Sequence, residues 1–193
     1  MNETYKAMTE CAGEAARIAG KVPGHSLDGP TTCSDFDLRT LVNHWVLYTS
    51  YGLEHRALKK QLPQELVERD FAAEEDWPAA YAAQLDRALE AWSDPAAWEG
   101  EVSFGGGHAA PASQVAEMIV KEMAVHGWDV ARSIGEDFRI GDESAALVLR
   151  VVEEHGDLYR SYQGFADPVA LPASASLFDR ALAASGRDPR WSR

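Results

Sequence analysis

The chain has 193 residues and a formal net charge of −13, from 18 basic and 31 acidic side chains. This length is enough for one domain with a substantial hydrophobic core. Proteins that bind nucleic acid normally carry a basic patch, and the nearest approach to one here is the pair Lys59 and Lys60. We therefore expect neither nucleic acid nor an anionic membrane surface as a partner.

The N-terminal segment carries acidic residues and lacks a long apolar run, so it is unlike a signal peptide. No stretch approaches the roughly 20 apolar residues of a membrane-spanning helix. The two cysteines, Cys11 and Cys33, make no disulfide framework. These features predict a cytoplasmic protein with free thiols, organised as a single domain over residues 1–193.

Apolar residues recur with a helical period of about 3.6 along most of the chain. The first predicted helix covers residues 3–19. The second covers residues 35–60, and it follows an S-x-x-D capping arrangement made by Ser34 and Asp37. Pro78 stands at an early position of the third, over 77–92, where proline favours a helix start.

A glycine-rich connection over residues 98–110 leaves room for a small hairpin around 101–104. Its GGGH segment, 105–108, lacks the pattern of a phosphate-binding loop, so we expect a flexible loop there. A fourth helix is predicted over 111–134, a fifth over 142–159 and a short one over 174–184.

The pattern predicts an all-α protein, a four-helix bundle with a short C-terminal helix and a small hairpin.

Glu122 and His126 are four residues apart in an otherwise apolar stretch of the fourth predicted helix. Residues at this spacing stack on one helical face, and this stripe also includes Val115, Met118 and Ile119. A carboxylate in such a stripe loses hydration and needs a partner or a cation. The pair is therefore half of a divalent metal site, although the same spacing also fits an ordinary surface hydrogen bond.

The second predicted helix carries a candidate third ligand, His44, at the flank of its apolar face. Tyr48, Tyr51 and His55 follow at i+4, i+7 and i+11, and they are candidates for contacting a substrate or moving a proton. Two histidines and one carboxylate match catalytic zinc and also a mononuclear iron(II) centre. A histidine in such a position, taken alone, is more often an ordinary half-buried residue than a metal ligand. Helical periodicity also cannot show that the second helix packs against the fourth.

Three segments resemble one bacterial family. Residues 31–46, TTCSDFDLRTLVNHWV, are similar to the T-x-C-x-x-W-x-V-x-x-L-V-x-H segment of the mycothiol-dependent maleylpyruvate isomerase N-terminal domain, with Phe36 in place of tryptophan. Residues 121–135, KEMAVHGWDVARSIG, resemble its E-x-x-x-H-x-W-D-x-A-R-x-x-G helix. Residues 174–191 resemble the D-R-x-L-x-x-x-G-R-D-P element that closes single-domain members. The chain thus resembles the DinB/YfiT-like metal-binding superfamily.

This resemblance implies a four-helix bundle that holds one divalent metal ion, with His44, Glu122 and His126 as its ligands. A glutamate at position 122, where many DinB-like proteins carry histidine, matches the isomerase branch. The resemblance also implies mycothiol as a low-molecular-weight thiol. The family's isomerase has a second, C-terminal domain that contributes to its active site, so we expect here a single-domain member that does not isomerise maleylpyruvate.

Several neighbouring residues also match the family. Asp129 could cap a loop, pair with Arg132 or orient a metal ligand, and we expect a structural role. Arg187 indicates a tail that packs against the bundle. Cys33 precedes His44 by about three helical turns, so we expect it to lie too far away to be a fourth ligand. Three ligands leave an open coordination position, which favours an enzyme over a structural site.

Three functions remain open from the sequence. The leading hypothesis is a metal-dependent enzyme, with zinc as the expected ion, that acts with a small thiol such as mycothiol on an electrophilic substrate, as a transferase or isomerase. The second is a hydrolase or oxygenase with a 2-His-1-carboxylate centre. The third is a non-catalytic metal-binding or interaction protein, in which the ion joins the second and fourth helices. A homodimer is compatible with each.

Overall fold

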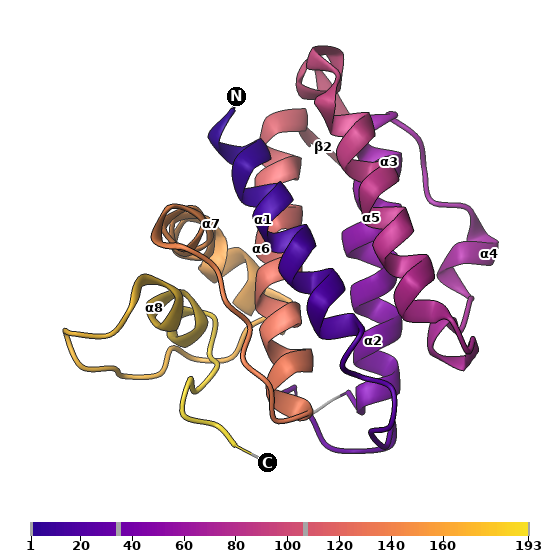
Figure 1. Cartoon of the computed structure of the whole chain (residues 1–193). Coiled ribbons are helices and arrows are strands. Elements are labelled where there is room, and N and C mark those ends of the chain that lie inside the picture. Colours follow the sequence, from indigo (N-terminus) through magenta and orange to yellow (C-terminus); the bar gives the residue numbers. More distant parts are fainter. Residues whose placement is uncertain (1, 34–35, 106–107, 193) are drawn as a thin grey trace.

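The structure, a computed structural model, describes residues 2–33, 36–105 and 108–192. Four helical segments form a bundle (Figure 1). They are α1 (Glu3–Ala19), the consecutive pair α2 (Leu38–Val46) and α3 (Gly52–Ala57), α5 (Trp77–Ser93) and α6 (Ala112–Ser133). Helix α1 packs against α5 and α6, α2 packs against α6, and α3 packs against α5. The predicted all-α bundle is confirmed.

Two further helices lie together on one side of the bundle (Figure 1), with α7 against α1 and α6 and α8 against α7. Their bounds are Asp142–Ser161 for α7 and Leu177–Ala184 for α8. The predicted hairpin is formed by the antiparallel strands β1 (Glu101–Gly105) and β2 (His108–Pro111), while residues 106–107 of the GGGH segment lie outside the described residues. The short elements α4 (Gln64–Val67), Phe71–Ala73 and Pro95–Trp98 were not predicted.

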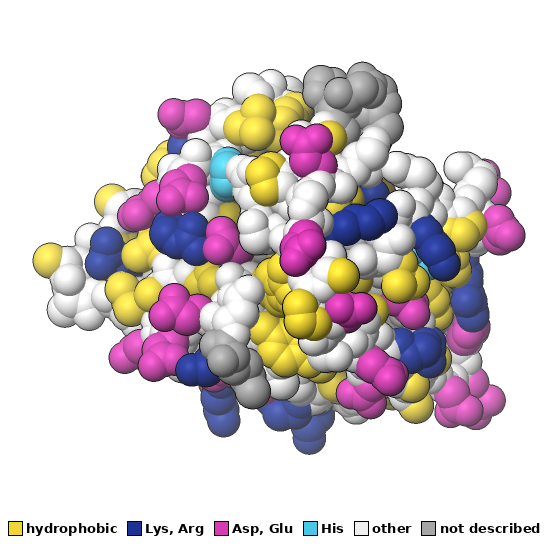
Figure 2. All heavy atoms as spheres, turned by 90° about the horizontal axis from the view of Figure 1, so that it is seen from above, with side chains coloured by type: hydrophobic (Ala, Val, Ile, Leu, Met, Phe, Trp, Pro, Cys, Tyr) yellow, Lys and Arg dark blue, Asp and Glu magenta, His cyan; other side chains and the backbone are white. Residues whose placement is uncertain are grey.

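On the face seen in Figure 2, Lys and Arg side chains are interspersed with Asp and Glu rather than gathered into one patch. Exposed pairs such as Arg150 with Glu117, 2.9 Å apart, typically contribute about 0–1 kcal/mol to stability.

Within the described ranges, no helix combines the length and the apolar character needed to cross a membrane.

The second helix begins later than predicted. The Asp37 side chain accepts a hydrogen bond from Thr40 N at 2.8 Å, so Asp37 is itself the N-cap and the helix starts at Leu38. The predicted capping box, with Asp37 as its third helical residue, is therefore wrong, and Ser34 and Asp35 lie outside the described residues. The helix therefore begins three residues, less than one turn, later than predicted.

Between α2 and α3 the helix widens into one π-helical turn, Leu47–Tyr51, and Gly52 N–H donates to the carbonyl oxygen five residues back. The buried hydroxyls of Thr49 and Ser50 donate to carbonyl oxygens four residues back, each at 2.7 Å. Because such side-chain hydrogen bonds compete with the regular helix ladder, they favour the wider turn. Single π turns inside α-helices are frequent at functional sites.

Helix α6 is the centre of the structure, since α1, α2, α3 and α7 all pack against it. A helix covered on several sides must be apolar around most of its circumference, and α6 is. Its fully buried charged residues are Lys121 and Asp129. Buried charges must be paired, and these two stand one and three positions from the predicted ligands Glu122 and His126.

Gly127 allows an aromatic ring to pack directly on the backbone of α6, because a Cβ atom at this position would lie 2.3 Å from Cε2 of Phe138. Overpacking of this kind costs about 1–3 kcal/mol, against about 1 kcal/mol that alanine gains over glycine in a helix. We expect Gly127→Ala to lower the free energy of unfolding by about 1–2 kcal/mol, measured by urea denaturation.

The matched control is Gly13→Ala on the exposed face of α1, where a Cβ atom would meet no heavy atom within 4 Å. This variant should raise the free energy of unfolding by about 0.5–1 kcal/mol. A Gly127→Ala protein as stable as the Gly13→Ala protein would contradict the described packing of Phe138 on α6.

Candidate metal centre

The three predicted ligands converge where α2 packs against α6. Oε2 of Glu122 lies 3.1 Å from Nε2 of His126 and 4.0 Å from Nε2 of His44. One ligand atom from each residue falls within 4.8 Å of the other two. The two imidazole rings meet edge to face, with their centroids 4.9 Å apart.

This arrangement fits a single divalent cation. A tetrahedral ion with bonds of about 2.0–2.1 Å keeps its ligand atoms about 3.3–3.4 Å apart. The two distances from Glu122, 3.1 and 4.0 Å, lie on either side of that separation. Two imidazoles and one carboxylate also form the protein ligand set of many catalytic zinc sites, in which a further position stays open.

The second carboxylate oxygen of Glu122 is occupied by a buried lysine. Nζ of Lys121 donates to Oε1 of Glu122 and lies 3.9 Å from the ring centre of Tyr159. Lys121 is only 1% exposed, so the carboxylate and the aromatic ring must replace its lost hydration. Glu122 therefore presents one oxygen to Lys121 and the other to the histidines. The site predicted from the sequence did not include Lys121. Its position within the apolar stretch of α6 is the sequence feature that could have indicated a buried partner for Glu122.

His126 is oriented by a carboxylate on its own helix. Its Nδ1 lies 2.9 Å from Oδ2 of Asp129. An imidazole that donates its Nδ1 proton to a carboxylate presents the lone pair of Nε2 on the opposite side of the ring. Asp129 thus directs Nε2 of His126 toward Glu122.

Asp129 is fully buried and receives several donors. The guanidinium of Arg187 binds both of its oxygens, with Nε 3.0 Å from Oδ1 and Nη2 2.8 Å from Oδ2. Thr32 Oγ1 also donates to Oδ1, and Cys33 Sγ lies 3.5 Å from Oδ2. Arg132, the partner considered from the sequence, binds elsewhere. The C-terminal tail therefore packs back on the bundle through Arg187.

The surroundings of Glu122 keep its carboxylate charged. Burial by itself raises the pKa of this group, but the charge of Lys121 and hydrogen bonds from His126 and His44 hold it well below its usual range. Glu122 is therefore an anion at neutral pH, as a metal ligand must be.

His126 is the basic counterpart. Burial lowers its pKa, but hydrogen bonds with Asp129, Cys33 and Glu122 raise the pKa well above the ordinary histidine value. Burial raises the pKa of Asp129, but the charge of Arg187 and the hydrogen bond from His126 lower it below its usual range. A cation that binds Nε2 of His126 at neutral pH must therefore displace a proton.

A cavity of about 360 Å³ opens beside the three residues. Polar and aromatic side chains from the loop after α1, the end of α7 and the tail contribute to its wall. They include Thr32, Cys33, Phe36, Tyr159, Tyr162 and Arg187.

Cys33 lies closer to the candidate ligands than the sequence suggests, although it does not join the group of His44, Glu122 and His126. The loop before α2 folds on itself, with Thr31 Oγ1 accepting a hydrogen bond from Cys33 N–H at 3.0 Å. Cys33 Sγ thereby reaches the cavity and comes within 4.8 Å of His126 and Asp129 ligand atoms. These three groups make a poor second metal site, because Asp129 already binds the cation of Arg187.

The three candidate catalytic residues occupy different surroundings. The Tyr48 ring lies against His44, with centroids 4.7 Å apart. Tyr51 stacks on Phe71 at 5.2 Å, and Nδ1 of His55 lies 2.8 Å from the Tyr51 carbonyl oxygen. None of the three contributes to the wall of the cavity beside the ligands.

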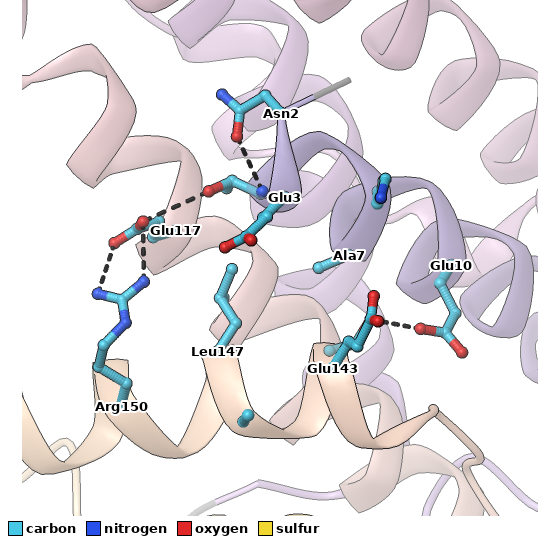
Figure 3. Close-up of a pocket in the computed structure, with 12 residues that line it drawn as sticks. Asn2, Glu3, Ala7, Glu10, Glu117, Glu143, Leu147 and Arg150 are labelled. Carbon is cyan, nitrogen blue, oxygen red and sulfur yellow. Dashed lines mark hydrogen bonds and ion pairs between the residues drawn. The ribbon is translucent and has the colours of Figure 1, made fainter.

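A larger hollow of about 800 Å³ lies elsewhere, between α1, α6 and α7 (Figure 3). Two of its acidic groups are engaged, since Glu117 binds Arg150 and Thr4 and Glu10 accepts from Gly141 N at 2.8 Å. Its described wall contains neither histidine nor cysteine. Size alone therefore does not identify the functional site.

Comparison with known families agrees with this geometry. Residues 8–131, well over half of the chain, match the model of the mycothiol maleylpyruvate isomerase N-terminal domain. The chain belongs to this family. The matched segment contains all three candidate ligands, whereas Arg187 lies beyond it. Neither a search of curated proteins nor a search of solved structures gives a match.

Membership of the mycothiol maleylpyruvate isomerase N-terminal domain family places the bundle in the DinB/YfiT-like superfamily, as the motifs indicated. The match covers α2 and nearly all of α6, so the two helices that carry the ligand cluster belong to the family's shared part. The pair α7 and α8 and the tail follow the match, and they add Tyr159 and Arg187 to the surroundings of the cluster.

Removing the charge of Asp129 should strongly destabilise the fold. Breaking a buried ion pair on one side costs about 3–5 kcal/mol, because the other charge remains buried without compensation. We expect Asp129→Asn to lower the free energy of unfolding by that amount in urea denaturation. Adding Arg187→Met should restore part of the loss, because the cation that had lost its partner is then removed as well.

The control for this experiment is Asp137→Asn, which removes an exposed carboxylate that pairs with Arg132. Its effect should stay within about 1 kcal/mol. If the Asp129→Asn and Asp137→Asn proteins unfold at the same urea concentration, the Asp129–Arg187 pair does not have the energetic role assigned to it.

Proposed function

We propose that the chain is a metal-dependent enzyme, with zinc as its ion, that activates a small thiol such as mycothiol toward an electrophilic substrate. The observation that carries the proposal is the convergence of His44, Glu122 and His126 beside a cavity with polar walls. Membership of a mycothiol-related family supports the choice of thiol. We also propose that residues 1–193 act as one domain, because the tail supplies a buried contact to α6.

In this proposal Nε2 of His44, Nε2 of His126 and Oε2 of Glu122 hold the cation. A divalent cation in this position lowers the pKa of a thiol beside it, so that thiolate is available at neutral pH. Lys121 keeps the second oxygen of Glu122 engaged, so Glu122 offers a single ligand atom. Asp129 holds the Nδ1 proton of His126 and with it the direction of Nε2.

His44 stands at the open side of the cluster. Its side chain is 31% exposed, whereas that of His126 is 15% exposed. The rings of Phe36 and Tyr48 flank it at centroid distances of 5.7 and 4.7 Å. Phe36 lines the cavity, so a ligand that enters it passes this ring. Tyr48, whose ring lies against His44, is the catalytic candidate that we retain for contact with the substrate.

The same cluster also supports two other functions. Water or dioxygen could take the open position in a hydrolase or oxygenase, and a purely structural ion could join α2 to α6. Structural zinc sites normally close with four protein ligands, and the three residues here adjoin a cavity of about 360 Å³. This cavity favours catalysis over a structural role.

Titration with cobalt(II), which reports its coordination in the visible spectrum, tests the proposal. We expect about one cobalt ion per chain. His44→Ala and Glu122→Gln should each weaken cobalt binding by about 100-fold or more, because loss of a residue that only hydrogen-bonds to a ligand already costs about 10–100-fold. His55→Ala is the matched control, because His55 lies on the same helical segment and binds a backbone carbonyl. Unchanged cobalt affinity in both ligand variants would remove the proposed centre.

The second step of this experiment adds mycothiol to the cobalt-loaded protein. A sulfur-to-cobalt charge-transfer band should appear and should persist in Cys33→Ser, which excludes the protein's own nearby thiol as its source. The serine analogue of the thiol should give no band. If cobalt binds but mycothiol gives no band, the metal centre stands and its role in thiol activation is wrong.

A further inference from the structure

A second cavity, of about 280 Å³, adjoins the first on the other side of the ligand cluster. The two cavities share His44, Glu122 and Tyr159 in their walls. The remaining wall of the second cavity is formed by Tyr48, Gly52, Arg56, Val115, Met118 and Ile119. The cluster therefore lies at the junction of two compartments, one with polar walls and one with mainly apolar walls.

The apolar compartment is elongated and leads away from the cluster. On the α2–α3 side, its wall residues follow His44 at intervals of four and end at Arg56. On the α6 side they run backward from Glu122 to Val115. The seven residues from Glu122 to Val115 span about 10 Å of helix, whereas the twelve from His44 to Arg56 span about 18 Å. A ligand about 10 Å long with one end at the cluster would therefore meet Arg56 through the guanidinium at the end of that long side chain.

The two ends of this compartment differ in charge. Arg56 is half-buried, and its Nη1 donates to the Ser103 carbonyl oxygen at 3.1 Å. Among the described residues that line the compartment, it is the one with a permanent positive charge. Between Arg56 and the cluster the α6 wall is aliphatic, and Gly52 contributes no side chain that would narrow the space.

We propose that this compartment binds the electrophilic substrate, and that the substrate has an apolar body about 10 Å long with a terminal carboxylate. The reactive end lies at the cluster, the apolar body lies against Val115, Met118 and Ile119, and the carboxylate binds Arg56. The polar cavity then remains available for the thiol. This inference rests on the proposed function.

The volume sets the size of a suitable probe. A buried apolar cavity of about 150 Å³ holds one benzene molecule, and this compartment is nearly twice as large at about 280 Å³. A phenyl ring with a short carboxylate chain therefore fits. The probe is 3-phenylpropanoate, and its neutral counterpart is 3-phenylpropanol.

Binding of both probes is measured by calorimetry and by ligand-observed NMR, with zinc-loaded and with metal-free protein. We expect Arg56→Gln to weaken 3-phenylpropanoate by about tenfold and to leave 3-phenylpropanol unchanged, while Arg56→Lys retains most of the affinity. Ile119→Trp fills the compartment and should abolish binding of both probes. Arg150→Gln, at the larger hollow between α1, α6 and α7, is the control and should change neither affinity.

The proposal is overturned if 3-phenylpropanoate does not bind the native protein, or if it binds equally well to the Arg56→Gln and Ile119→Trp proteins. Circular dichroism checks that each variant is folded. The two substitutions act at opposite walls of the compartment, so each tests the proposal even if the other variant fails to fold. Probe binding to metal-free protein is independent of the cobalt and thiol measurements. A missing thiol band therefore contradicts the proposed function without contradicting the compartment.

Discussion

The buried ion pair between Asp129 and Arg187 is the interaction on which the candidate centre depends. It joins the middle of α6 to the C-terminal tail, and through Thr32 and Cys33 it also fixes the loop before α2. An unpaired charge at this depth would cost several kcal/mol, so α6 and the tail must dock together. The same carboxylate holds Nδ1 of His126. Docking of the tail is therefore coupled to the orientation of a candidate metal ligand.

The surrounding architecture explains why polar groups collect at this point. Because α6 is covered on several sides, a charged residue on it must find its partner within the fold. Lys121 is accommodated by Glu122 and by the ring of Tyr159, and Tyr159 belongs to α7. The same ring contributes to both cavities. Packing of α7 on the bundle thus supports Lys121 beside Glu122 and supplies a ring to the wall of both compartments.

The sequence predicts the fold and the local part of the centre well, because both follow from helical periodicity. The bounds of α1 and α6, and the pairing of Glu122 with His126, are read from spacings of three and four residues. His44 could be joined to that pair only through resemblance to a family, since periodicity within one helix says nothing about its neighbour. The contacts of Arg187 and Cys33 were missed for a related reason, as they depend on loops and a tail without periodicity. The π turn was also missed, because Thr49 and Ser50 look like ordinary helix residues until their hydroxyls are seen to bind backbone carbonyls.

The most direct test of this account is the protonation and coordination of His126, observed by long-range proton–nitrogen correlation NMR during a zinc titration. The account predicts that zinc shifts Nε2 of His126 and of His44, while Nδ1 of His126 keeps its proton because Asp129 accepts it. In Asp129→Asn with Arg187→Met, which avoids an uncompensated buried cation, the proton on Nδ1 should be less strongly held and zinc binding weaker. If zinc leaves Nε2 of His126 unshifted, or binds Nδ1 instead, the central role assigned to Asp129 is contradicted.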